Sequence, residues 1–312
     1  MVHAALDPTV HPASEHATVA ARPRKRLMPH RYQTQFAICA IAKDENSYVL
    51  EWAAYHLGIG FDHVFIYDNQ SKNPLVNEFA GNKADKYVTI TRWPTALGRN
   101  AQIEAYAHCI EHHGSRFDWI AIIDLDEFIN LKMDKSINDF LSRFENADGI
   151  VVNWRIFGSS GEQTYRPAPT MARFTRASPV SFHPNGLVKS IFRPRSVVGF
   201  RVHHALYRED ALVLTTARLR MHGTDYVDPI MINLAEAQIN HYFVKSREEW
   251  RTKVLRGYTD GTIRTDQEFD SYDLNDVEDI TIMCRMETTL RWMRDLAGKR
   301  PDYFRSLKKI FS

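Results

Sequence analysis

Short apolar runs alternate with amphipathic segments through the first half of the chain. Four runs are rich in apolar or β-branched residues and have the length of one buried strand: residues 36–42, 63–67, 87–91 and 119–123. Between them, apolar side chains recur at helical spacing around Trp52, and residues 100–113 also have a helical pattern. The order strand, helix, strand, strand, helix, strand predicts an α/β nucleotide-binding half.

The second half of the chain has weaker patterns. Helices are predicted at residues 137–144 and 248–256, and a long amphipathic helix at residues 277–296. Strands are predicted at residues 149–157, 187–192, 197–201, 212–214, 219–221 and 238–244. Residues 1–34 have no apolar periodicity and carry a basic cluster at residues 22–26, which predicts a disordered N-terminal arm.

Composition narrows the class of protein. The chain has 312 residues, of which 44% are hydrophobic, so it can bury a sizeable core. Its net charge of +2 indicates no nucleic-acid partner. The three cysteines lack the paired spacing of a metal site, and Cys39, in an apolar run, is expected to be a buried, reduced thiol.

Membrane segments are also not expected from the sequence. It contains neither a run of 18 apolar residues nor a signal peptide's apolar region, so we expect no membrane span. Arginines 285, 291 and 294 line the final helix, which leaves contact with a membrane surface or another subunit open. The oligomeric state is not predicted.

The clearest chemical signal follows the apolar run at residues 119–123, which ends on Asp124, Asp126 and Glu127. If the chain is extended there, Asp124 and Asp126 face the same side and offer the hard oxygen ligands that Mg²⁺ or Mn²⁺ prefers. Ligands of open α/β sheets bind outside the carboxyl ends of the strands, where these acids lie. The alternative interpretation is a turn with solvated acids.

Other polar residues follow the predicted strands or precede the helices. Asp44 follows the first strand, and Asp68 follows the second. Arg99 precedes the helix at residues 100–113, where it either grips phosphate or is simply exposed. His56 lies on the apolar face of the first helix and is expected to be a core histidine.

These residues, taken in order, resemble glycosyltransferase family 92 and related family-2-like bacterial glycosyltransferases. The resemblance covers residues 36–257 and is carried by the following set: Lys43-Asp-Glu, Glu51-Trp52, Tyr55-His56, Tyr67-Asp-Asn-Gln-Ser71, Gln102, Tyr106, Cys109, Trp119, Asp124-Leu-Asp-Glu-Phe128, Trp154, Phe157-Gly158, Asn240-His-Tyr242, Lys245-Ser246 and Lys253.

The resemblance implies a single α/β domain of the GT-A (Rossmann-like) type with a mixed central sheet. Its nucleotide-binding half would span residues 35–130 and its acceptor-binding half residues 131–260, with a C-terminal helical extension at residues 261–312. It also implies a metal-dependent, inverting hexosyltransferase that uses a nucleotide sugar, commonly UDP-galactose. The acceptor would be a glycan or a lipid-linked glycan, as in polysaccharide biosynthesis. Because no anchor is expected, the enzyme would be cytoplasmic, with at most peripheral contact at the inner face of the membrane.

The resemblance also implies roles for individual residues. Asp124 and Asp126 match the metal-binding acids, and His241 matches a late histidine near the metal. The donor would be held by strand-end and helix residues: Lys43, Asp44, Glu45, Asp68, Asn69, Arg99, Gln102, Asp124 and Lys245. An inverting displacement also needs a carboxylate base, for which Glu162 is the first candidate and Asp225 the second.

Several alternatives stay open. Glu127, adjacent to the metal pair, is either a further candidate base or a residue that holds the loop, and His241 is either a ligand or a core histidine. A metal-dependent nucleotidyltransferase or phosphohydrolase would use the same acidic pair. A non-catalytic module that binds a sugar or nucleotide is the third class of function.

Overall fold

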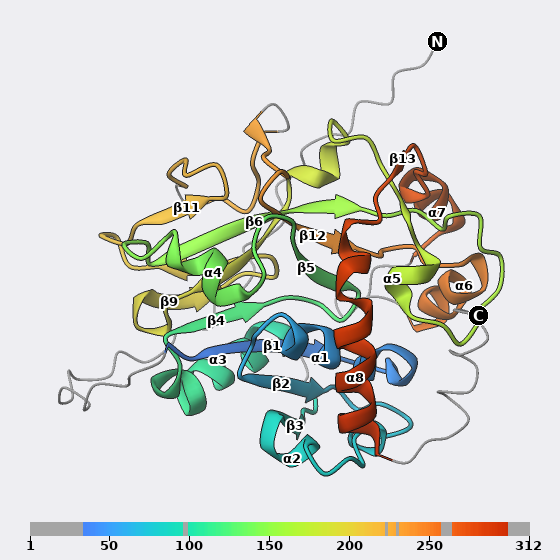
Figure 1. The fold of residues 1–312 in the computed structure, drawn as a ribbon, viewed down its shortest axis with the longest axis horizontal. Coiled ribbons are helices and arrows are strands. Elements are labelled where there is room, and N and C mark those ends of the chain that lie inside the picture. The colour runs from blue at the N-terminus through green and yellow to red at the C-terminus, as the bar shows by residue number, and fades with distance from the viewer. Residues whose placement is uncertain (1–33, 96–98, 222–223, 229–230, 257–263, 299–312) are drawn as a thin grey trace.

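The computed structural model describes residues 34–95, 99–221, 224–228, 231–256 and 264–298. The predicted arm at residues 1–34 lies outside these ranges except for its last residue. Within the described residues, nine strands form one mixed sheet in the order β3-β2-β1-β4-β8-β6-β12-β5, and β11 pairs with β6 (Figure 1). This arrangement confirms the predicted α/β class and mixed central sheet.

The first half of the sheet is parallel, as the apolar runs predicted. Its strands are β1 (Phe36–Ala42), β2 (His63–Asp68), β3 (Val88–Arg92) and β4 (Trp119–Ile122). Each of the three pairings among them is parallel. Their connecting helices are α1 (Asn46–Gly58), α2 (Ala84–Tyr87) and α3 (Ala101–His113). The carboxyl ends of these strands therefore lie at one edge.

The second half is mixed, because later strands run in both directions beside β4. They are β5 (Glu127–Leu131), β6 (Gly149–Ile156), β8 (Val188–Phe192), β11 (Val213–Thr215) and β12 (Ala237–His241). Strand β8 is antiparallel to both β4 and β6, whereas β12 is parallel to β6 and antiparallel to β5.

Smaller elements complete the domain. The helices are α4 (Ile137–Ser142), α5 (Thr170–Arg173), α6 (Arg247–Arg256), α7 (Asp266–Tyr272) and α8 (Met286–Ala297). Strand β9 (Val197–Phe200) pairs with β10 (Ala205–Tyr207). Strand β7 (Arg176–Ala177) pairs with β13 (Val277–Glu278). None of the helices in the described ranges is long and apolar enough to cross a membrane.

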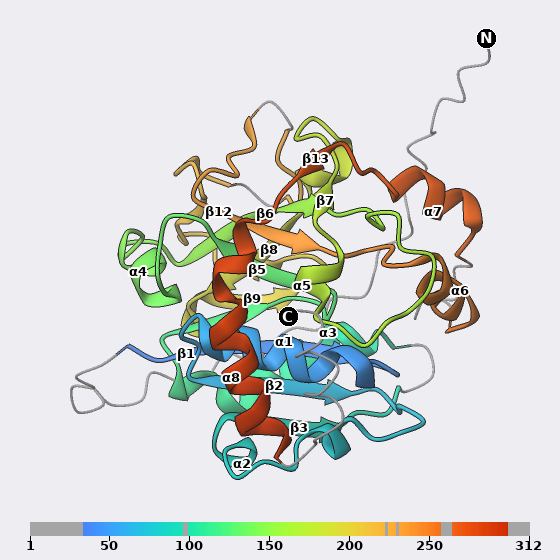
Figure 2. The same cartoon turned by 45° about the vertical axis from the view of Figure 1, so that its right-hand side comes forward.

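Two apolar clusters sandwich the sheet. One face is covered by α1 and α8, which pack against each other, and the other by α3 with β9 and β10 (Figures 1 and 2). Ile282, Met286, Met293, Leu296 and Ala297, from the described part of the chain after residue 260, therefore pack on the same core. The predicted helix at residues 277–296 is wrong in its first part: β13 and a 3-10 turn (Thr281–Arg285) precede α8.

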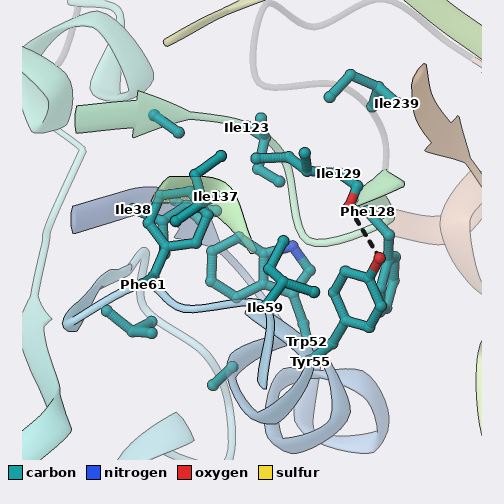
Figure 3. Packing of buried hydrophobic residues seen from close by; sticks show 14 of the residues in the cluster. Ile38, Trp52, Tyr55, Ile59, Phe61, Ile123, Phe128, Ile129, Ile137 and Ile239 are labelled. Atoms are coloured by element: carbon teal, nitrogen blue, oxygen red, sulfur yellow. Dashed lines mark hydrogen bonds between the residues drawn. The ribbon is translucent and has the colours of Figure 1, made fainter. Parts of the chain in front are cut away.

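Helix α1 fixes the strand that follows the acids. The indole of Trp52 donates a hydrogen bond to the carbonyl oxygen of Glu127 (2.8 Å), and the hydroxyl of Tyr55 donates one to the carbonyl oxygen of Ile129 (2.8 Å; Figure 3). His56 is fully buried between the Trp52 carbonyl and the Ile129 amide, as expected of a core histidine. Strand β5 therefore begins at a fixed place.

Candidate active site

Four strand ends bring the predicted acids together with basic side chains. Residues 124–127, here called the acidic turn, connect β4 to β5. The antiparallel pairing of β5 with β12 places His241 opposite Glu127. The antiparallel pairing of β8 with β4 sets Ser190 beside Ile122, so Lys189 lies next to the acidic turn.

The Asp124 carboxylate accepts hydrogen bonds from three side chains. Its Oδ2 accepts a hydrogen bond from Lys189 Nζ at 2.7 Å, and its Oδ1 accepts bonds from Gln102 (2.9 Å) and Tyr106 (3.4 Å). Gln102, predicted to bind the donor, hydrogen-bonds to this carboxylate. Lys189 is fully buried and also lies 3.6 Å from Glu127.

Asp126 has different partners. Its Oδ2 accepts a hydrogen bond from Lys253 Nζ at 2.6 Å, and its Oδ1 lies 3.6 Å from Nε2 of His241. Lys253 comes from α6 and also donates to the Phe243 carbonyl oxygen. The prediction of an extended chain with both acids turned the same way is therefore wrong: the chain turns between Asp124 and Asp126, and each carboxylate pairs with its own lysine.

Glu127 stabilises the acidic turn. Its Oε2 accepts the backbone amide of Asp124 at 2.9 Å, which supports the interpretation that this residue holds the loop. Its Oε1 and Nδ1 of His241 are both buried without a hydrogen-bond partner among the described residues, and they lie 3.9 Å apart. The His241 ring packs against the Trp154 ring at a centroid distance of 4.3 Å.

Burial and neighbouring charges perturb the protonation of this cluster. Burial raises the pKa of Asp126, but the Lys253 ammonium and His241 outweigh it and hold that pKa well below its usual range. Burial raises the pKa of Glu127 well above its usual range, against the opposing effect of Lys189. Burial lowers the pKa of His241 and that of Lys253, the latter to about 8.

The donor set fits part of a divalent metal site. Among the described residues, no group of three or more histidine, cysteine or acidic side chains is arranged to hold a metal ion. Asp126 and His241 are close enough to contact one ion, because two ligands about 2.1 Å from a Mg²⁺-sized ion can lie up to about 4.2 Å apart. The unpartnered Nδ1 of His241 faces Glu127, and a carboxylate commonly orients a metal-binding histidine in this way. Asp126 and His241 are thus placed to contact one such ion, and each of the two aspartates also pairs with a lysine.

The loops after β1 and β12 meet beside the acidic turn. Lys245 Nζ is buried, lies 3.5 Å from Glu45 and stacks on the Tyr48 ring. Asp44 and Lys245 both have φ of 55°, a strained conformation that is common at functional sites. Lys43, on the loop after β1, is exposed.

The loop after β2 is held by its own polar residues. The Asp68 carboxylate accepts the amides of Ser71 and Leu75, each at 2.9 Å. The side-chain Nδ2 of Asn69 donates to the Trp93 carbonyl oxygen and the Thr95 hydroxyl. Asp68 and Asn69, both predicted to hold the nucleoside, thus stabilise the loop after β2 in this structure.

Arg99 lies apart from the acids. Its side chain is exposed, and its guanidinium pairs with Glu104 on the first turn of α3. No contact between Arg99 and the acidic turn is present among the described residues. In this structure Arg99 is therefore an exposed arginine, as in the second of the two interpretations.

The two candidate bases differ in their surroundings. Glu162 pairs with Arg166 at 2.7 Å. Asp225 lies 3.9 Å from Nδ1 of His204. The neighbouring His203 packs on Trp154, whose other ring contact is His241.

A surface hollow of about 320 Å³ is lined in part by His204, the residue that lies 3.9 Å from Asp225. Val151, Tyr207 and Met221 contribute apolar surface, and Arg208 and Arg220 contribute charge. His204 lines the hollow, and neither of its ring nitrogens has a hydrogen-bond partner among the described residues. This hollow can accommodate a polar ring of the size of a sugar.

Sequence reasoning missed the part that Lys189 plays. A lysine in the apolar run at residues 187–192 is itself a signal, because a buried lysine needs a partner. Lys253 belonged to the ordered set of motif residues but received no role. Its contact with Asp126 depends on how α6 packs, which local sequence does not reveal.

Comparisons with known sequences identify the family of this chain. The family model for glycosyltransferase family 92 matches residues 34–281. A family 92 glycosyltransferase protein from Ricinus communis is 29% identical over 133 residues, which cover 41% of this chain and 23% of that protein. A second alignment with a protein of that name is 25% identical over 239 residues and covers 73% and 38%. A rice relative (Oryza sativa subsp. japonica) is 27% identical over 123 residues, covering 39% and 20%. The matched part thus spans less than half of each relative.

Solved structures show a more distant likeness. The structure of S. aureus TarS residues 1–349 in complex with UDP is 12% identical, with a TM-score of 0.32, and covers 58% of this chain and 60% of that one. The Mn/GDP form of core-mannan synthase A from Aspergillus fumigatus is 11% identical, with a TM-score of 0.26 and coverage of 51% and 52%.

Proposed function

The chain belongs to glycosyltransferase family 92, and on this basis we propose that it transfers a sugar from a nucleotide diphosphate sugar to an acceptor hydroxyl. The observation that carries the proposal is the cluster of Asp126, His241 and Lys253 at the carboxyl edge of the sheet. Ligands of open α/β sheets bind at this edge. We propose a UDP-linked hexose, such as galactose, as the donor and a glycan as the acceptor.

The donor would lie across the loops that follow β1 and β12. The buried ammonium of Lys245 and the exposed Lys43 are positioned to meet its negative charge. Asp126 and His241 would hold a divalent ion, Mn²⁺ or Mg²⁺. When bound, such an ion stabilises the negative charge that develops on the departing diphosphate.

The reaction itself would be a single displacement with inversion. An acceptor oxygen forms a bond to the anomeric carbon while the bond from that carbon to the diphosphate oxygen breaks, and the hydroxyl proton passes to a carboxylate. Asp225 is the better candidate for this base because its neighbour His204 lines the hollow and the adjacent His203 packs on Trp154. Glu162 is less suited, because Arg166 already neutralises it.

The test compares Asp225→Asn with Glu162→Gln. With Mn²⁺ and a panel of UDP-sugars, the wild-type protein should slowly release UDP and free sugar, because water can replace the acceptor. NMR should detect the sugar first as the inverted anomer. Asp225→Asn should lower kcat about 10²–10⁴-fold, while Glu162→Gln, the matched carboxylate control, should change it little.

Different outcomes contradict different parts of the proposal. Release of pyrophosphate or sugar 1-phosphate would indicate a nucleotidyltransferase or phosphohydrolase. Binding of the donor without turnover in any acceptor screen would indicate a binding module. A selective loss in Glu162→Gln would move the base to Glu162.

A further inference from the structure

Three carboxylates at the candidate donor site each pair with a different lysine. Asp124 pairs with Lys189 at 2.7 Å, Asp126 with Lys253 at 2.6 Å, and Glu45 with Lys245 at 3.5 Å. All three lysines are buried, with exposed side-chain fractions of 1%, 7% and 2%. Positive charge therefore already compensates these acids in the protein alone.

Lys253 and a divalent ion would contact the same carboxylate, that of Asp126. The Lys253 ammonium lies on the same carboxylate that faces His241, the pair that fits the ion. An ammonium and a divalent cation on one buried carboxylate repel each other strongly, because the local dielectric constant is low. The ion alone would thus have to displace Lys253 or bind against its charge.

A nucleotide diphosphate changes this balance. The diphosphate of a UDP-sugar carries two negative charges, so that an ion and a diphosphate together add no net charge to the cluster. A displaced ammonium would then have phosphate oxygens as a new partner. Either ligand alone would leave a buried net charge, which is costly.

We propose that Lys253 couples the divalent ion to the donor: its ammonium neutralises Asp126 in the free protein and turns to the diphosphate when both ligands bind. This inference rests on the proposed function and adds a positioning role for Lys253. When no nucleotide is bound, Lys253 weakens the binding of the ion. By linkage, the ion and the nucleotide then strengthen each other's binding by the same factor.

The test measures Mn²⁺ binding by calorimetry and EPR, with and without UDP, in wild type, Lys253→Met and Lys132→Met. Lys132 is the matched control because it also pairs with a buried aspartate, Asp279 (3.4 Å), but beyond the far end of β5. UDP should increase the Mn²⁺ affinity of wild type and Lys132→Met about tenfold or more. Lys253→Met should bind Mn²⁺ alone about tenfold more tightly, and UDP should then add little.

The inference is overturned if Lys253→Met binds Mn²⁺ alone no better than wild type, or keeps the full effect of UDP. If Lys253→Met does not fold, Lys253→Gln removes the charge but keeps a donor to Asp126, and the same two outcomes apply. Failure of UDP to bind any variant would instead contradict the proposed donor. The Mn²⁺ titrations without UDP would still decide whether Lys253 competes with the ion.

Discussion

Replacing Lys189 with methionine removes the positive charge that compensates the acidic turn. Lys189 is fully buried, 2.7 Å from Asp124 and 3.6 Å from Glu127. The attraction across 2.7 Å is about 6 kcal/mol at an effective dielectric constant of about 20, before desolvation is counted. Breaking a buried pair leaves an uncompensated carboxylate and costs about 3–5 kcal/mol. Because the Asp124 side chain is 31% exposed, we expect Lys189→Met to lose about 3 kcal/mol of unfolding free energy.

Urea denaturation followed by circular dichroism measures this loss, with the m-value as a check that the transition stays two-state. The double variant Lys189→Met/Asp124→Asn should recover about 1 kcal/mol or more, because the second substitution removes one uncompensated charge. Lys132→Met removes a lysine that is 20% rather than 1% exposed and that lies 3.4 Å from its aspartate, so it should lose about 1 kcal/mol or less. A loss below about 1 kcal/mol in Lys189→Met, or no recovery in the double variant, would refute the reasoning.

Two further predictions concern stability. Tyr55→Phe removes the hydroxyl that donates to the Ile129 carbonyl oxygen and should cost about 1 kcal/mol in urea denaturation, and an unchanged midpoint would contradict a role in holding β5. Burial lowers the pKa of His56 from 6.5 to about 3, so only the unfolded state gains its proton between these pH values. Stability should therefore fall as pH drops below 6.5, by up to about 1.4 kcal/mol per pH unit from this residue. His56→Gln should show a shallower fall, and an identical pH dependence would assign the acid sensitivity to other groups.

The accuracy of the sequence predictions followed the strength of the local signal. Strands β1, β2 and β4 were predicted nearly to the residue because each is a continuous apolar run. Strand β5 was missed because Glu127 and Asn130 interrupt its pattern, although both are buried with partners in β12 and beyond. The predicted strand at residues 219–221 is wrong, since it makes only an isolated bridge between Leu214 and Arg220.

The sequence predicted the acidic residues of the candidate site but not the lysines that pair with them. Asp124, Asp126 and His241 were selected as one site, and the structure places them in one cluster. The pairing of each aspartate with a separate lysine was not predictable, because Lys189 and Lys253 lie 65 and 127 residues away from their partners. Local spacing carries no information about contacts of that range.

The position of β12 has a consequence for synthesis of the protein on the ribosome. Strand β5 is made early, yet its only strand partner among the described residues is β12, about one hundred residues later. Until residue 241 has emerged, the nascent chain has an unpaired β5 edge, and such edges favour aggregation. A chain that stops before Lys253 would also leave Asp126 without its cation. The site is therefore completed only after residue 253 has emerged, and a product that terminates before β12 would expose β5 to chaperones and proteases.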